Sequence, residues 1–291
     1  MSELKERKNL PKHDKFEKAA DQAKTIHKQA ADDSHHFLFA VDSVPKFLRH
    51  GPWSPLAYLF LAVMVGYLLF KFSHAYEDFL SNVDPRIDLL ESSGIWWRAA
   101  IGVYGIVIII LVCHYVGIWP MASFTMMSWS LFTLRYLLGV AYVCYPTVHH
   151  TYYGYELLRF PALLCNSMTV SIWWLILVPL LVFHMKRTHP HAITPFFKFN
   201  RSFVMINIHI LNLPLSALDH IVSSRKLIYF DLWIALCIGI IYVCIYLFIM
   251  EPKGMHFYHV VLSPRPHWCV LWYTALIALF PMYWWLWNYF I

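Results

Sequence analysis

Residues 198–220 form an apolar run that contains three side chains able to take part in proton transfer or strong hydrogen bonding: His209, Asn212 and Asp219. Asn212 follows His209 by three positions and Asp219 follows it by ten, so helical periodicity places all three near one face. Pro214 removes a backbone hydrogen bond and is expected to kink the helix, which would open space beside the imidazole. This pattern is typical of a general base with orienting groups, and equally of polar contacts between membrane helices.

Two hydroxyl groups that such a base could activate lie in the segment 121–145, at Thr125 and Thr133. A nucleophilic threonine needs a base within hydrogen-bond reach, and His209 is the only histidine expected at mid-membrane depth. Counted from the inner ends of the two segments, Thr133 is level with His209, whereas Thr125 is about 12 Å shallower on helical rise. Threonine hydroxyls also commonly bond to carbonyls of their own helix, which is the structural alternative for both.

Arg135 lies in the middle of the same segment and needs a counter-ion, because a charge at bilayer depth costs about 2.5–3.5 kcal/mol. Asp219 or Asp231 is the expected partner. A structural ion pair between helices and a site for a substrate carboxylate are both compatible with this arginine.

Metal chemistry is the competing interpretation of the 17 histidines. Only His256 and His259 have a spacing suited to a shared metal ion, and no acidic ligand follows in register. The six cysteines all lie in apolar segments without a C-x-x-C pair, so we interpret them as small buried hydrophobic residues. We therefore expect neither a metal nor an organic cofactor.

The elements that position these residues are long apolar runs. Hydrophobic residues make up 59% of the chain, aromatic residues 18% and charged residues 14%, which is typical of a multi-pass membrane protein and excludes an ordinary soluble domain. About 20 residues cross the ~30 Å of hydrocarbon. The expected spans are 54–72, 97–118, 121–145, 161–184, 198–220, 228–250 and 268–290.

The fold class predicted from these runs is an all-α polytopic bundle of transmembrane helices, with a six-span core and one extra N-terminal span. We divide the chain into a cytosolic polar head with an interfacial segment (1–53), an extra apolar span with an acidic loop (54–96) and a six-helix membrane domain (97–291). No internal repeat is visible.

Lysine and arginine counts predict the orientation. With the N-terminus in the cytosol, the inner segments hold sixteen of these residues and the outer segments six. We therefore expect a cytosolic N-terminus in an integral protein of the endoplasmic reticulum, another endomembrane or the plasma membrane. The net charge of +6 is modest and gives no indication of nucleic-acid binding.

The order His209, Asn212, Pro214 and Asp219 resembles a span of the androgen-inducible and rolling-stone family of six-span membrane proteins. The segment 254–262, followed by two prolines, is similar to the Gly-Met-x-x-Tyr-Pro-x-Leu connection of animal members. The resemblance extends over about residues 97–291.

This resemblance implies a hydrolase, because some members cleave fatty acid esters of hydroxy fatty acids with a membrane-embedded threonine and a histidine. The family's histidine corresponds to His209. Its threonine often lies in a Leu-Thr-x-Trp context, but here Trp129 follows Thr125 two residues later than that pattern, and alignment on the tryptophan places Met127 at the nucleophile position. Thr125 is therefore a shifted match, and Thr133 is the second candidate.

The leading hypothesis is a lipid-ester hydrolase in which Thr125 or Thr133 attacks the carbonyl and His209 accepts the proton. Asn212 or Asp219 would orient the imidazole, and Arg135 would bind a fatty acid carboxylate. The expected partners are the lipid bilayer and a hydrophobic lipid substrate.

Two alternatives are open. One is a non-enzymatic structural, accessory or adhesion protein in which the polar stripe only holds helices together. The other is a transporter with Arg135 and Asp219 on a conduction path, although no inverted repeat supports it. A threonine hydroxyl near the His209 ring, at a lipid-accessible cavity, would favour the hydrolase.

Overall fold

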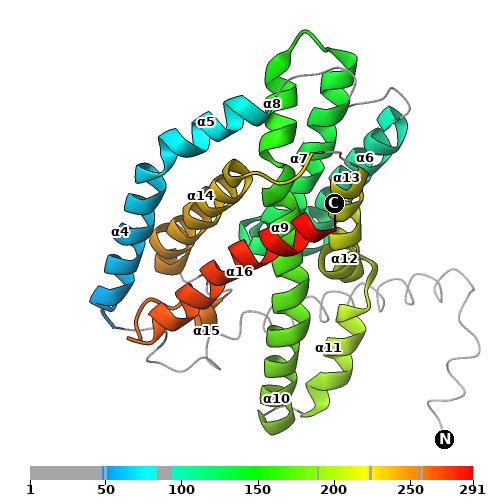
Figure 1. Cartoon of the computed structure of the whole chain (residues 1–291). Coiled ribbons are helices and arrows are strands. Elements are labelled where there is room, and N and C mark those ends of the chain that lie inside the picture. Colours follow the sequence, from blue (N-terminus) through cyan, green and yellow to red (C-terminus); the bar gives the residue numbers. More distant parts are fainter. Residues whose placement is uncertain are drawn as a thin grey trace, which may run out of the picture.

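The structure is a computed structural model, and the residues that it describes form helices, turns and loops but no strand (Figure 1). Six helices are long and apolar enough to cross a membrane, and the number is seven if a bent pair of helices forms one span. The all-α polytopic fold is thereby confirmed. The described residues are 48, 51–83, 94–188, 190–222, 225–253, 255 and 258–290, with the side chains at 188, 259 and 260 left out. The predicted polar head (1–36) and most of the interfacial segment lie outside these ranges.

The predicted extra N-terminal span corresponds to the bent pair, α4 (Pro55–Phe70) and α5 (Phe72–Asn82), which meet at an angle of 45°. The side chain of Ser54 accepts a hydrogen bond from the Leu56 N–H and begins α4. The prediction of a loop directly after residue 72 was wrong, because the chain continues as α5 to Asn82. Residues 84–93 of the predicted acidic loop lie outside the described ranges.

Helices α6 (Ile95–Val116) and α7 (Phe124–Cys144) form an antiparallel hairpin, joined by the 3-10 turn η4 (Trp119–Ala122). Gly105 of α6 lies directly against Thr133 of α7. A Cβ atom at Gly105 would approach the Thr133 Oγ1 atom closely and would lie 2.8 Å from its Cγ2 atom. The absence of a side chain at Gly105 therefore allows the two backbones to approach, as small residues commonly do between membrane helices.

One helix of 39 residues runs the height of the molecule, from His149 to Arg187 (Figure 1). At 1.5 Å per residue it is about 58 Å long, almost twice the hydrocarbon thickness, so it extends beyond both ends of the predicted span 161–184. Its segments are α8 (His149–Leu157), α9 (Arg159–Ser171), the π-helical η5 (Ile172–Leu177) and α10 (Val178–Thr188). The described residues from 159 to 169 are all buried, which makes α9 the centre of the bundle.

The predicted span 198–220 is broken near its start. After η6 (Pro190–Ala192), helix α11 (Ile193–Asn200) ends, and a new helix begins at Phe203 behind the capping side chain of Ser202. This helix consists of α12 (Phe203–Ile206), the π-helical η7 (Asn207–Leu211) and α13 (Asn212–Val222). The π turn lies directly before Pro214, where the missing N–H leaves a carbonyl of the preceding turn without its usual donor.

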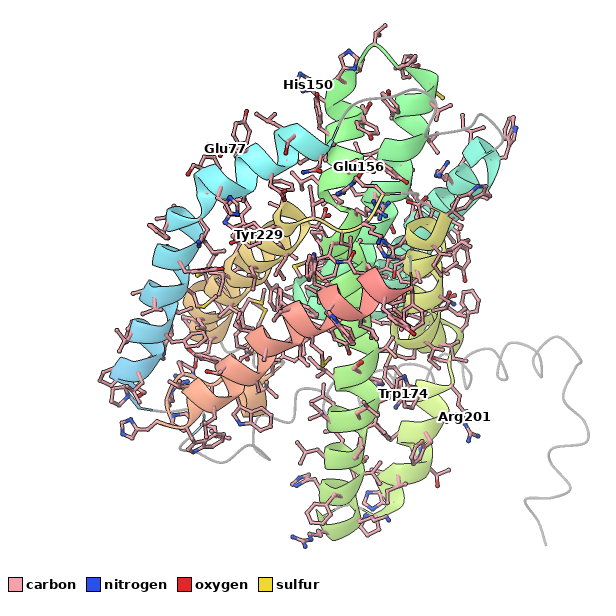
Figure 2. The ribbon with its side chains drawn as sticks, viewed as in Figure 1. Glu77, His150, Glu156, Trp174, Arg201 and Tyr229 are labelled. Atoms are coloured by element: carbon pink, nitrogen blue, oxygen red, sulfur yellow. The ribbon has the colours of Figure 1, made fainter. Side chains whose placement is uncertain are left out.

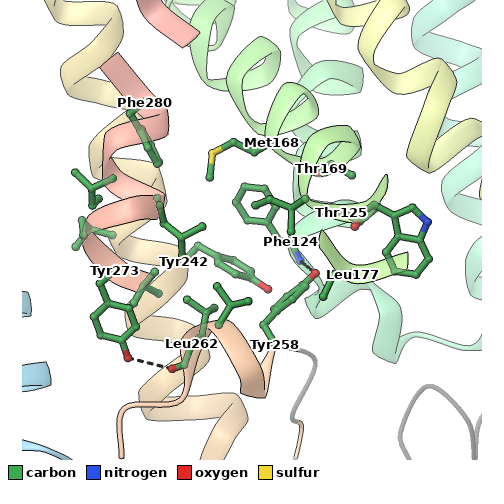
Figure 3. A pocket seen from close by; sticks show the side chains of 18 of the residues that line it. Phe124, Thr125, Met168, Thr169, Leu177, Tyr242, Tyr258, Leu262, Tyr273 and Phe280 are labelled. Carbon is green, nitrogen blue, oxygen red and sulfur yellow. Dashed lines mark hydrogen bonds between the residues drawn. The ribbon is translucent and has the colours of Figure 1, made fainter. Parts of the chain in front are cut away.

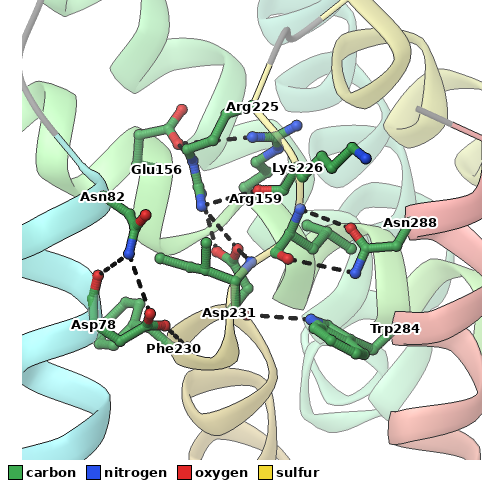
Figure 4. Close-up of polar contacts among 12 residues, drawn as sticks. Asp78, Asn82, Glu156, Arg159, Arg225, Lys226, Phe230, Asp231, Trp284 and Asn288 are labelled. Carbon is green, nitrogen blue, oxygen red and sulfur yellow. Dashed lines mark hydrogen bonds and ion pairs between the residues drawn. The ribbon is translucent and has the colours of Figure 1, made fainter.

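The last two crossings lie against α9. The first of them comprises α14 (Tyr229–Ile245), the π-helical η8 (Tyr246–Met250) and the 3-10 turn η9 (Glu251–Lys253). The second is α16 (Cys269–Tyr289), and the short helix α15 (His259–Leu262) lies between the two in the chain. The carboxylate of Asp78 accepts a hydrogen bond of 2.9 Å from the Phe230 N–H, so α5 caps the start of α14 (Figure 4). Figure 2 places Glu77, His150 and Glu156 toward one end of the bundle and Arg201 toward the other.

We expect Gly105→Ala to destabilise the protein by roughly 1–3 kcal/mol, because the new methyl group must displace Thr133 in a well-packed contact. The measurement is thermal unfolding of the purified protein in detergent. Gly66→Ala in α4 is the matched control, since its Cβ would meet nothing within 4 Å. Equal melting temperatures for the two variants would show that the α6–α7 contact is looser than described.

Candidate functional site

The structure brings Thr125 and His209 together. The Thr125 Oγ1 atom lies 3.5 Å from the His209 Nε2 atom, although the residues are 84 positions apart. Ser123 fixes the start of α7 by accepting a hydrogen bond from the Met126 N–H, so Thr125 lies in the first turn of that helix. The His209 side chain is 5% exposed and belongs to the π turn η7.

Thr133 does not contact His209. Its hydroxyl donates to the Trp129 carbonyl at 2.8 Å, and its methyl group lies against Gly105. The prediction from depth counting was wrong because the helix that carries His209 begins at Phe203 and not at residue 198. His209 is therefore near the start of its helix, at the same depth as Thr125 near the start of α7.

Packing, and not a carboxylate, orients the imidazole. The His209 ring stacks on Trp173 with centroids 4.1 Å apart, and the Trp174 Nε1–H donates to the His209 carbonyl at 2.9 Å. Among the described residues, the buried Nδ1 atom has no partner that meets normal hydrogen-bond geometry. The expected orienting bond from Asn212 or Asp219 is therefore not present, because both side chains are bonded elsewhere.

Asn212 belongs to a polar seam between three helices. Its Nδ2 donates to the Asn166 Oδ1 at 2.9 Å, and the Asn166 side chain donates in turn to the Ser128 carbonyl. The Ser128 hydroxyl contacts the Thr169 hydroxyl at 2.9 Å and bonds to the Thr125 carbonyl. The seam connects α13 to α7 through α9, and so holds the helix of His209 in register with the helix of Thr125.

Asp219 and Arg135 form the predicted ion pair, at 2.9 Å between Oδ2 and Nη2. The second carboxylate oxygen accepts from the Arg98 Nε–H at 3.0 Å, and the Tyr155 hydroxyl donates to Oδ2 at 2.7 Å. Sequence reasoning missed Arg98 because it stands at the end of its span, where an arginine normally reaches the interface. These contacts give Arg135 a structural partner in place of the expected substrate carboxylate.

A second ion network joins Glu156, Arg225 and Asp231 (Figure 4). Arg225 bonds to Glu156 at 2.8 Å and to Asp231 at 3.0 Å, which assigns Asp231 to Arg225 and not to Arg135. Burial alone would lower the pKa of Arg225, but the Asp231 and Glu156 carboxylates raise it above its ordinary value. The loop between α13 and α14 is thus tied to α8 by a cation that keeps its charge.

A cavity of about 120 Å³ lies beside Thr125 (Figure 3). It is lined by residues of α4, α7, α9, η5, α14, α15 and α16, and none of the described residues that line it is charged. Its wall is mainly apolar and includes Met168, Ile172, Ile277 and Phe280. Its hydroxyl groups belong to Thr125, Thr169, Tyr242, Tyr258 and Tyr273.

Tyr258 is the residue of this site that sequence reasoning missed. Its hydroxyl oxygen accepts a hydrogen bond of 3.0 Å from the Phe124 backbone N–H, and Tyr258 lines the same cavity as Thr125. The available signal was its place in the segment 254–262, where it matches the tyrosine of the Gly-Met-x-x-Tyr connection. His256 and the side chain of His259 lie outside the described part of that segment.

The fold and the site define a multi-pass α-helical membrane protein with a threonine–histidine contact beside an uncharged cavity. Comparison of the chain with protein-family models, with curated proteins and with solved structures finds no match. The resemblance to the androgen-inducible and rolling-stone family stays a prediction that depends on the residues described above.

We expect Asp219→Asn to destabilise the protein by about 3–5 kcal/mol, since it leaves two buried guanidinium groups without a counter-charge. Glu77→Gln removes the same charge from an exposed position on α5 and is expected to change stability by less than about 0.5 kcal/mol. Thermal unfolding in detergent compares the two variants. A melting temperature for Asp219→Asn equal to that of Glu77→Gln would contradict the assigned role of the ion cluster.

Proposed function

We propose that the protein is a membrane-embedded hydrolase of lipid esters, with Thr125 as the nucleophile and His209 as the general base. The observation that carries this proposal is the contact of 3.5 Å between Thr125 Oγ1 and His209 Nε2 at the wall of an uncharged, mainly apolar cavity. A structural polar contact would not require a cavity beside the threonine, whereas an ester with an apolar acyl chain does.

In the proposed reaction, the Thr125 oxygen forms a bond to the ester carbonyl carbon while its proton moves to His209 Nε2. The tetrahedral intermediate then collapses, the C–O bond to the alcohol breaks, and His209 returns the proton to the leaving oxygen. Water, deprotonated by His209, next attacks the acyl-threonine ester; the bond between the carbonyl carbon and the Thr125 oxygen breaks, His209 returns the proton to that oxygen, and the fatty acid is released. The distance of 3.5 Å is long for a hydrogen bond, but such contacts tighten when substrate binds.

The position of Thr125 at the start of a 21-residue helix supports this role. The first N–H groups of a helix have no intrahelical acceptor, and the helix dipole places about half a positive charge there. Negative charge that develops on a carbonyl oxygen beside Thr125 would therefore be stabilised by α7 itself.

The substrate class and the location are finer parts of the proposal. The family resemblance suggests fatty acid esters of hydroxy fatty acids as substrates. The distribution of lysine and arginine suggests a cytosolic N-terminus, in an endomembrane or the plasma membrane.

A second candidate function is non-enzymatic, as a structural or accessory membrane subunit. The observation that favours it is the use of Asn212, Asp219 and Arg135 in contacts between helices, which leaves His209 without a carboxylate partner. The two candidates differ in one measurable property, which is turnover of a lipid ester.

We expect Thr125→Ala and His209→Ala each to lower kcat for a lipid ester by at least about 10³-fold, because each change removes a member of one catalytic unit. Thr125→Ser should retain measurable turnover. Thr133→Ala is the matched control and should keep kcat within a few-fold of wild type. The assay uses purified protein in detergent against long-chain esters, including a fatty acid ester of a hydroxy fatty acid. Absence of wild-type turnover, or equal turnover by Thr125→Ala, would favour the non-enzymatic function.

We expect Ile277→Trp to reduce the preference for long acyl chains over acetyl esters, because the indole fills the cavity and leaves Thr125 and His209 in place. The ratio of kcat/KM for a long-chain ester to that for an acetyl ester should fall by about 10-fold or more. Leu271→Trp on the exposed face of α16, where Leu271 is 73% exposed, is the control. An unchanged ratio in Ile277→Trp would place the acyl chain elsewhere.

A further inference from the structure

We propose that Tyr258 is a further catalytic residue, whose hydroxyl donates a hydrogen bond to the oxyanion that forms when Thr125 attacks the ester. This inference rests on the proposed hydrolase function and adds a role that neither Thr125 nor His209 can fill.

The first argument is the position of the phenol. Tyr258 lies just before α15, and its ring projects into the cavity beside Thr125 (Figure 3). The hydrogen bond of 3.0 Å from the Phe124 N–H fixes its oxygen at the start of α7. Because Phe124 directly precedes Thr125, this bond holds the phenol next to the attacking oxygen.

The second argument is the direction from which the ester must approach. Thr125 and Tyr258 both line the cavity, whereas His209 is not among its lining residues and contacts the Thr125 hydroxyl. A carbonyl that enters from the cavity therefore meets the Thr125 hydroxyl, which contacts His209, on the side of Tyr258. When the Thr125 oxygen bonds to the carbonyl carbon, the carbonyl oxygen is attached to that same carbon. The Tyr258 phenol, which lies beside Thr125, can therefore donate to it.

The third argument compares the three phenols of the cavity. The Tyr242 hydroxyl donates to the Ala122 carbonyl at 3.2 Å, and the Tyr273 hydroxyl donates to the Leu262 carbonyl at 3.0 Å. Tyr258 is the phenol whose oxygen is held against the first turn of α7. The N–H that it accepts from Phe124 polarises its own O–H, which makes it a stronger donor.

The chemistry requires that Tyr258 keep its proton. As the bond from Thr125 Oγ to the carbonyl carbon forms, the π electron pair moves to the carbonyl oxygen, and the phenol donates a hydrogen bond to that charge. When the intermediate collapses, the pair returns and the alcohol leaves with the proton from His209. Burial raises the pKa of Tyr258, so the phenol remains a neutral donor through both steps.

The first test is Tyr258→Phe, which removes only the hydroxyl. Loss of one oxyanion donor is expected to lower kcat by about 10²–10³-fold, while KM changes by less than about three-fold. Tyr136→Phe is the matched control, because it also removes one phenol hydroxyl, bonded at 2.6 Å to the Leu215 carbonyl and remote from the cavity. Tyr136→Phe should keep kcat near wild type. Melting temperatures are measured for both variants.

The second test separates catalysis from a capping role at α7. A trifluoromethyl ketone with a long alkyl chain forms a tetrahedral adduct with the threonine oxygen, whereas the corresponding ether only occupies the cavity. In Tyr258→Phe, affinity for the ketone should fall by the same factor as kcat/KM, and affinity for the ether should stay within about three-fold of wild type. A purely structural role would weaken binding of both compounds equally.

Each outcome decides the inference. A selective loss of kcat and of ketone affinity in Tyr258→Phe supports it. Wild-type kcat in Tyr258→Phe, or equal losses of ketone and ether affinity, overturns the role of Tyr258 while the hydrolase function stands. Absence of both turnover and ketone binding in the wild-type protein overturns the hydrolase function, and the role of Tyr258 with it.

Discussion

The arrangement of the bundle depends on the buried carboxylate of Asp219, which lies between the guanidinium groups of Arg98 and Arg135. These three residues are at most 5% exposed and belong to three different helices, α13, α6 and α7. Each charge alone would cost about 2.5–3.5 kcal/mol at bilayer depth. The three helices must therefore pack in the one register that brings both arginines to this carboxylate. Apolar packing between helices in lipid does not impose such a register.

The site follows from that register. Asp219 fixes one end of α13, and the bond from Asn212 to Asn166 fixes the other end against α9. Between Asn212 and the start of the helix, the π turn η7 holds one more residue than an α-helical turn, which rotates the preceding residues by roughly 100°. This rotation explains why His209 does not share the face of Asp219, as regular helical periodicity predicts, and meets Trp173 and Thr125 instead.

The sequence was sufficient for features that depend on composition and on single buried charges. The apolar runs predicted the helices, and the rule that a membrane arginine needs a counter-ion predicted that Arg135 pairs with Asp219 or Asp231, of which the structure shows Asp219. The sequence was insufficient where contacts with neighbouring segments determine the backbone conformation. The break before Phe203 and the π turn before Pro214 depend on capping by Ser202 and on packing against α9. Tyr258 reaches Thr125 only through the fold, since 133 residues separate them in the chain.

The separation of the ion cluster from the cavity agrees with the chemistry that we propose. Attack by Thr125 on an ester creates a positive imidazolium and a negative oxyanion within a few ångströms, so the site gains no net charge. At about 4 Å, and with an effective dielectric constant of 20, the attraction between two such charges is about 4 kcal/mol. A carboxylate beside His209 would add a third charge to a cavity that is otherwise uncharged, and it would need a counter-ion of its own. In the proposed reaction, a neutral phenol and the positive end of α7 would stabilise the oxyanion without that cost, so the proposed threonine–histidine pair would not need the acidic member that sequence reasoning expected.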